Sequence, residues 1–231
     1  MKRIETYITK KYVRQFRSDG RAEVLKAGWI RKMMTKLKLE PKEVVEFDCG
    51  SGRILAELSK HYPNISFKGF DTSPQAINIA RKQVGKRLEF FDTDFLSWRQ
   101  STDLLLVINV LEREPDYYGL LESLRSKAAN FIFYVPLDIS RRSLLRPKVM
   151  RRQRESSGAI HYFSKEMVLW MMEDSGYEII DWYYAKPLRD VETAKGLLTK
   201  IKKTVRNVSF FLNKEKAVRW WGGYSMLIAA R

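Results

Sequence analysis

The 231-residue chain has a single cysteine, Cys49, and its longest apolar run, from Leu104 to Leu111, is interrupted by Asn109. One cysteine excludes an internal disulfide and a cysteine-based zinc site, so we expect no metal. The run is far shorter than the roughly 20 residues that span a bilayer, and no apolar signal segment follows the charged start of the chain. We therefore predict a cytoplasmic protein that is neither secreted nor transmembrane.

Acidic residues are also scarce, with 27 Asp and Glu against 43 Lys and Arg, which gives a formal net charge of +16. The excess lies at the two ends: residues 1–43 carry +8, residues 44–138 carry −2, and residues 139–231 carry +10. Three interpretations stay open: solvated faces, an anionic small-molecule, glycan or lipid-linked substrate, and nucleic acid. The length indicates one domain over 1–231.

From Val44 onward, short apolar runs alternate with helical segments, which is typical of an α/β protein. The expected strands are 44–47, 66–70, 88–91, 104–108, 131–135, 177–184 and 224–229, and the expected helices are 52–60, 74–84, 116–128 and 165–174. Ser73 with Pro74 indicates a helix start, and Gly176 a helix stop. The continuous runs LLLVI and FIFYV predict strands covered on both faces, hence a doubly wound, mostly parallel sheet.

Three basic segments lie before or between these expected strands and helices. Residues 1–43 form an N-terminal helical extension, with Ile30, Met33, Met34 and Leu37 at helical spacing. Residues 139–163 form a long connection, with seven basic and no acidic residues between Arg141 and Arg154. A second insertion, 191–219, contains a basic amphipathic stretch at 195–208, a pattern that helices on anionic membrane surfaces share.

The segment VVEFDCGSGR, residues 44–53, runs from an apolar strand into a glycine turn. Such a turn brings the backbone close to a ligand at the carboxyl ends of parallel strands. Asp71 follows Gly52 by 19 residues, near the spacing that places a carboxylate on ribose hydroxyls, so the pattern predicts an adenosine-containing ligand. A nicotinamide dinucleotide would require a third glycine where Leu55 stands, which argues against an oxidoreductase.

Five further segments follow this turn in order: FKGFDTSPQAINIAR (67–81), LEFFDTDF (88–95), TDLLLVINVLER (102–113), NFIFYVP (130–136) and GGYSMLIAAR (222–231). Together with the turn, they resemble the class I S-adenosylmethionine-dependent methyltransferases. The resemblance covers about residues 25–231 and keeps the order and spacing of the segments. It implies a seven-stranded sheet with helices on both faces and an antiparallel last strand. It also implies S-adenosylmethionine as the cofactor.

The resemblance further implies roles for individual residues. Glu46, Gly50 and Gly52 would form the cofactor turn against the methionine part, and Asn109 would face the same part. Asp71 would bind the ribose hydroxyls, while Asp94 with Phe95 would flank the adenine, and Asp92 is the alternative to Asp94. Asp48 departs from the pattern, since it stands where the family has its first glycine. An aspartate there would impose strain, repel the cofactor carboxylate, or attract the cofactor's sulfonium or ammonium.

For the acceptor side we single out His161 and Asp138 as catalytic candidates. His161 lies after the basic insertion and just before the expected 165–174 helix, where the resemblance implies residues over the substrate pocket, and a histidine titrates near neutral pH. Asp138 lies just past the fifth expected strand. Cys49 is interpreted as a small filler of the turn. Asn109-Val110-Leu111-Glu112 lacks the motif of amino-directed base methyltransferases, which makes nucleic acid the weaker partner prediction.

The prediction is therefore a methyltransferase for a small-molecule or anionic glycan or lipid-type acceptor. The alternative is a catalytically inactive member of the fold that binds nucleic acid or a protein through its basic surface. Nothing in the sequence indicates the oligomeric state.

Overall fold

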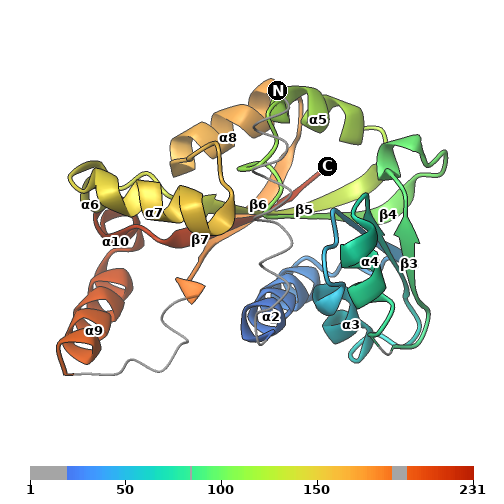
Figure 1. The fold of residues 1–231 in the computed structure, drawn as a ribbon, viewed down its shortest axis with the longest axis horizontal. Helices are drawn as coiled ribbons and strands as arrows, with labels where there is room; N and C mark the ends of the chain where they lie inside the picture. The colour runs from blue at the N-terminus through green and yellow to red at the C-terminus, as the bar shows by residue number, and fades with distance from the viewer. Residues whose placement is uncertain (1–19, 84, 189–196) are drawn as a thin grey trace.

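The computed structural model describes residues 20–83, 85–188 and 197–231, and its centre is a seven-stranded sheet (Figure 1). The strands follow the spatial order β3-β2-β1-β4-β5-β7-β6. β1 to β5 run parallel, and β7 runs antiparallel to both of its neighbours, β5 and β6. This arrangement confirms the predicted sheet and its antiparallel last strand. The strands are β1 (Glu43–Phe47), β2 (Ser66–Asp71), β3 (Leu88–Asp92), β4 (Thr102–Ile108), β5 (Ala128–Leu137), β6 (Ile179–Ala185) and β7 (Tyr224–Ala230).

Helices cover both faces of the sheet, as Figure 1 shows. One face packs on α2 (Arg21–Lys36), α3 (Arg53–Ser59) and α4 (Pro74–Ala80), and the other on α5 (Tyr117–Leu124) and α8 (Lys165–Asp174). Along β4, Leu105 and Val107 enter one core cluster, while Leu104 and Leu106 enter the other. Both sides of this strand are therefore buried, which is why its sequence is continuously apolar rather than alternating.

The predicted helix signals are confirmed. The Ser73 side chain caps α4 and Pro74 occupies its first turn, while Gly176 has φ 74° just after α8. Ile30 and Met33 are fully buried on α2, so the predicted N-terminal helix does pack against the sheet. Residues 1–19 of the predicted extension lie outside the described part of the chain.

The two basic insertions are more helical than their sequences indicated. Residues 139–163, predicted as a connection, contain α6 (Arg141–Leu144) and α7 (Pro147–Ser157), and the second insertion contains α9 (Leu197–Leu212) and α10 (Lys214–Trp221). Ser140 forms a capping box at the start of α6, and this local hydrogen bonding explains how a short polar segment becomes helical. Residues 191–196 lie outside the described part.

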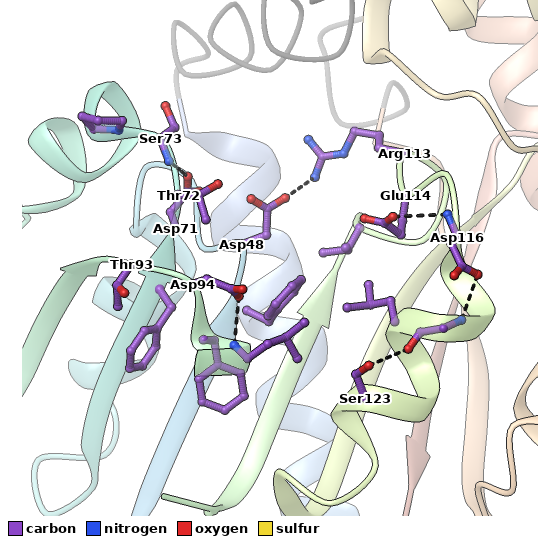
Figure 2. Close-up of a pocket in the computed structure, with 18 of the residues that line it drawn as sticks. Asp48, Asp71, Thr72, Ser73, Thr93, Asp94, Arg113, Glu114, Asp116 and Ser123 are labelled. Carbon is purple, nitrogen blue, oxygen red and sulfur yellow. Dashed lines mark hydrogen bonds and ion pairs between the residues drawn. The ribbon is translucent and has the colours of Figure 1, made fainter. Parts of the chain in front are cut away.

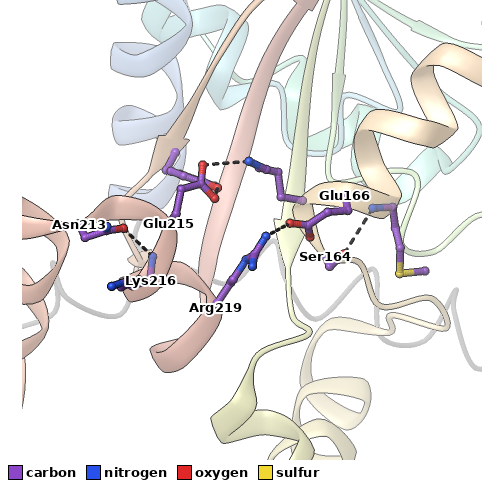
Figure 3. A network of polar contacts seen from close by, with 9 residues as sticks. Ser164, Glu166, Asn213, Glu215, Lys216 and Arg219 are labelled. Carbon is purple, nitrogen blue, oxygen red and sulfur yellow. Dashed lines mark hydrogen bonds and ion pairs between the residues drawn. The ribbon is translucent and has the colours of Figure 1, made fainter.

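A polar network fixes α10 against α8 and β6 (Figure 3). The Glu215 carboxylate accepts hydrogen bonds from Lys165 at 2.9 Å and from the Tyr184 hydroxyl at 2.8 Å. Arg219, one turn further along α10, donates to Glu166 at 2.6 Å. These contacts place the C-terminal insertion relative to the sheet.

Gly52, in the turn after β1, has φ 67° and is the N-cap residue of α3. A Cβ atom at this position would lie 2.4 Å from ring atoms of Phe90 and 3.0 Å from Ala80. The absence of a side chain here is required by packing of the turn on β3 and α4.

We predict that Gly52→Ala lowers the free energy of unfolding by about 2–4 kcal/mol, because left-handed backbone strain and overpacking add. Gly28→Ala is the control, since Gly28 lies in α2 with nothing within 4 Å of the added carbon. That change should stabilise the protein by about 0.5–1 kcal/mol. Urea unfolding without ligand measures both, and equal values for the two variants would contradict the prediction.

Candidate active site

A cavity of about 780 Å³ opens at the carboxyl ends of β1, β2 and β4 (Figure 2). Its walls come from the turns after β1 and β2, the short helix η1 (Phe95–Ser97) after β3, and the segment from Val110 to Ser123. This volume lies within the range of about 300–1,000 Å³ that small-molecule and cofactor sites occupy. The cavity is therefore large enough for a nucleoside-containing ligand.

Asp71 joins the two turns that form one wall of the cavity. Asp71 is 3% exposed, and its carboxylate accepts backbone hydrogen bonds from Gly50 and from Ser73, both at 2.8 Å. The side chain that the sequence predicted to bind ribose thus lines the cavity in a fixed orientation.

Asp48 lines the same cavity and has φ 55°, the left-handed conformation that favours glycine. Its carboxylate accepts a hydrogen bond at 3.2 Å from the guanidinium of Arg113, a side chain in the loop after β4 (Figure 2). The Arg113 side chain is 9% exposed and that of Asp48 is 27% exposed, so the ion pair is partly buried. The additional negative charge of Asp48 therefore faces a neighbouring cation.

Glu46 lies behind the cavity wall and is almost completely buried. One of its carboxylate oxygens, Oε2, has no hydrogen-bond partner among the described residues. Burial raises the pKa of Glu46 well above its ordinary value, and the nearby Lys26 ammonium opposes this shift. Unsatisfied buried polar atoms are unfavourable, so a hydrogen-bond donor of a bound ligand would be stabilised at this oxygen.

Lys26 reaches this region from α2. Its ammonium donates to the side-chain oxygen of Asn109, and the Asn109 amide donates to Glu112 at 2.9 Å. Burial lowers the pKa of Lys26, and burial likewise raises the pKa of Glu112. Asn109 is thus held between a cation and a carboxyl group at the end of β4.

The predicted cofactor residues fall into two groups. The cavity is lined by Asp48, Asp71, Asp94 and Phe95. Glu46, Gly50, Gly52 and Asn109 are not among the lining residues and stand behind them or in the adjoining turn. Asp92, the alternative to Asp94, is exposed and does not line the cavity. Asp94 also fixes η1, because its carboxylate accepts from the Leu96 amide at 2.9 Å.

Neither catalytic candidate is among the residues that line this cavity. The His161 ring packs edge-on against Tyr117 with centroids 5.0 Å apart, and its backbone amide donates to the Glu112 carbonyl at 3.0 Å. His161 Nε2 is buried without a hydrogen-bond partner among the described residues. Asp138 is buried directly after β5. Cys49 is buried in the turn, and burial raises the pKa of its thiol well above the usual range.

Sequence reasoning missed Lys26, Glu112 and Arg113 as members of the site. A signal for the last two exists, since charged residues that follow an apolar strand closely, as in VINVLER, lie at its carboxyl end. No comparable signal marks Lys26, because only the packing of α2 on the sheet brings it to Asn109.

The fold and the cavity define a doubly wound α/β protein with a nucleoside-type site at the carboxyl edge of its sheet. The family described as "methyltransferase domain" matches residues 18–181, and the chain belongs to this family of class I S-adenosylmethionine-dependent methyltransferases.

Among curated relatives, trans-aconitate 2-methyltransferase of Methylobacterium radiotolerans is 30% identical over 96 residues, which are 40% of this chain and 36% of that protein. The corresponding enzyme of Streptomyces coelicolor is 28% identical over 91 residues, 36% of this chain and 30% of that protein. The matched region therefore spans only about a third of the length of these relatives.

Solved structures resemble the whole fold more broadly. Magnesium protoporphyrin IX methyltransferase of Synechocystis PCC 6803, solved with S-adenosylhomocysteine, has a TM-score of 0.61 at 13% identity, covering 90% of this chain and 83% of that one. A plantazolicin methyltransferase has a TM-score of 0.56 at 17% identity, covering 97% and 89%. At these identities the similarity establishes the fold.

We predict that Glu46→Gln changes the pH dependence of stability. The pKa of Glu46 is raised in the folded state, so the unfolded chain ionises this group more readily than the folded protein does. The free energy of unfolding of the wild type therefore falls as pH rises from 4.5, the ordinary pKa, toward the raised pKa. The neutral amide does not undergo this loss, so the variant should gain stability relative to wild type as pH rises from 4.5 toward neutrality. Urea unfolding across this pH interval measures the difference. The exposed carboxylate change Glu173→Gln on α8 is the control, and a pH-independent difference for Glu46→Gln would refute the assignment.

Proposed function

We propose that this protein is an S-adenosylmethionine-dependent methyltransferase that acts on a small-molecule acceptor. The observation that supports this most directly is the Asp71 carboxylate, which the amides of two neighbouring turns hold at the wall of a nucleoside-sized cavity. Membership of the methyltransferase family agrees with it.

The residues present fit the cofactor. Asp71 would accept from the ribose hydroxyls, and Asp94 with Phe95 would flank the adenine. Glu46 has a buried oxygen available for the ammonium of the methionine part, and Arg113, a guanidinium with five N–H donors, would bind its carboxylate. When bound, S-adenosylmethionine supplies an activated methyl group on a positively charged sulfur. A cavity lined by Asp48 and other carboxylates favours such a charge.

The chain's own contribution to the reaction would be positional. Holding acceptor and methyl group in line is worth about 7–11 kcal/mol of the barrier in well-oriented reactions. His161 and Asp138 stay our candidates for removing a proton from the acceptor. His161 is favoured by its unpartnered buried Nε2 and by its packing on Tyr117, which lies close in sequence to cavity residues Asp116 and Gly119.

For the acceptor, we propose a small molecule or an anionic glycan or lipid-type intermediate. The named relatives methylate trans-aconitate and magnesium protoporphyrin IX, which supports the small-molecule class. The +10 charge of residues 139–231 supports an anionic acceptor or an anionic environment for it.

The decisive test is calorimetric titration of the protein with S-adenosylmethionine and S-adenosylhomocysteine, with NAD as the control ligand. We expect the first two to bind and NAD not to bind. If neither S-adenosylmethionine nor S-adenosylhomocysteine binds, the alternative of a catalytically inactive member of the fold is favoured instead.

Asp71→Ala should weaken cofactor binding at least tenfold, because the ribose hydroxyls lose their charged acceptor. Asp92→Ala is the matched control: Asp92 pairs in register with Asp71 on the adjacent strand but is exposed. Thermal unfolding verifies that both variants are folded. Unchanged affinity of a folded Asp71→Ala protein would overturn the ribose assignment.

A further inference from the structure

Helices α6, α7, α9 and α10 gather at one end of the molecule (Figure 1), which we call the basic end. α10 packs against α6 and α9, and α7 packs against α6. By sequence, residues 141–157 and 197–221 contain 14 Lys and Arg but only 2 Asp and Glu. These two segments, which contain the four helices, thus carry a net +12 of the +16 of the whole chain.

The basic end also exposes large apolar side chains. Leu145, directly after α6, is 81% exposed, and on α9 Phe211 and Leu212 are 87% and 76% exposed. Trp220 on α10 is half exposed, with the Arg141 guanidinium 5.2 Å above its ring. Most of the exposed large apolar side chains among the described residues lie on α6, α9 and α10. Such a concentration marks an interaction surface rather than scattered surface residues.

α9 has two distinct faces. Its inner face is attached to the protein: the Phe210 ring stacks on Tyr224 with centroids 5.0 Å apart, Ser209 accepts from the Trp221 indole at 2.8 Å, and Arg206 is buried. The network of Glu215 and Arg219 described above anchors the following helix, α10 (Figure 3). α9 is therefore held firmly, and its orientation follows from these contacts.

The outer face of α9 is an apolar stripe. Ile201, Val205, Val208 and Leu212 recur at the i, i+4, i+7, i+11 spacing of one helix face, and each is about half exposed or more. In a helix packed on a core this spacing marks the buried side. Here the stripe faces away from the residues that attach α9 to the protein.

We propose that the basic end docks on the surface of an anionic lipid bilayer. The stripe, together with the exposed Leu145, Phe211 and Trp220 of the basic end, would enter the boundary between headgroups and acyl chains, as apolar faces of interfacial helices do. The exposed cations Lys202, Lys214 and others would meet the lipid phosphates. No helix of the described residues has the length and apolarity needed to cross a bilayer, so the contact is peripheral.

Two other occupants fit the surface less well. Nucleic acid would satisfy the cations but would leave Leu145, Phe211 and Leu212 in contact with a polar, charged backbone. A second copy of the chain would cover the apolar side chains, but a two-fold contact sets the same surface against itself and therefore opposes two groups of +12. An anionic bilayer offers both an apolar layer and negative charge.

The helices proposed to dock on the bilayer are separate from the elements that form the cofactor cavity. None of the described residues that line the cavity lies on α6, α7, α9 or α10. Lipid binding is thus measurable without cofactor or acceptor, and its failure would leave the cofactor experiment unaffected.

The test is sedimentation of the full chain with vesicles of phosphatidylcholine alone and of equimolar phosphatidylcholine and phosphatidylglycerol. We expect binding to the anionic vesicles only, weakening as salt rises. Phe211→Ser/Leu212→Ser should reduce binding at least tenfold, and Lys214→Gln/Lys216→Gln about fivefold per charge removed. Val24→Ser, 49% exposed on α2, is the control and should bind as wild type does.

Absence of binding to anionic vesicles would overturn the proposal. So would binding that Lys214→Gln/Lys216→Gln weakens but Phe211→Ser/Leu212→Ser does not, since purely electrostatic adsorption needs no apolar stripe. Tight binding to a duplex RNA in place of vesicles, or a concentration-dependent dimer that Phe211→Ser/Leu212→Ser abolishes, would assign the surface to the competing occupants.

Discussion

The site depends on one carboxylate that accepts two backbone amides. Asp71 ends β2, and its oxygens bind the amide of Gly50 in the turn after β1 and the amide of Ser73 in its own turn. Two loops that follow different strands are thereby held in one geometry. Because charge-assisted bonds to backbone amides are short and strong, the wall of the cavity is preorganised before any ligand arrives.

Charge compensation is the second constraint on this region. The cavity is lined by Asp48, Asp71, Asp94, Glu114 and Asp116, while Arg113 is the one basic side chain among its described lining residues. Arg113 pairs with Asp48, and Lys26 behind the wall binds Asn109 near the buried Glu46 and Glu112. Two cations from separate elements thus stabilise a cluster of carboxylates whose mutual repulsion would otherwise oppose folding.

The molecule separates its charges spatially. A protein of net +16 keeps an acidic cavity at the β1–β4 side of its sheet and carries most of its positive charge on helices at the β5–β7 side. Under the two proposals above, long-range attraction to an anionic surface and local stabilisation of a cationic cofactor would be served by different elements. The polar contacts of Glu215 and Arg219 attach α10 to β6 and α8.

Much of this protein is determined by local sequence. Local signals specify the apolar strands β4 and β5, the helix start at Ser73 and the helix stop at Gly176, because each depends on residues close by in the chain. Asp71 is identified by its spacing in the sequence from Gly52. Tertiary structure alone decided the partner of Asp48, the place of Lys26 and the direction in which the stripe of α9 faces. Each depends on residues far apart in the chain, such as Asp48 with Arg113 and Phe210 with Tyr224. Periodicity identifies an apolar face, but only packing determines whether that face is buried in the protein or left for another surface.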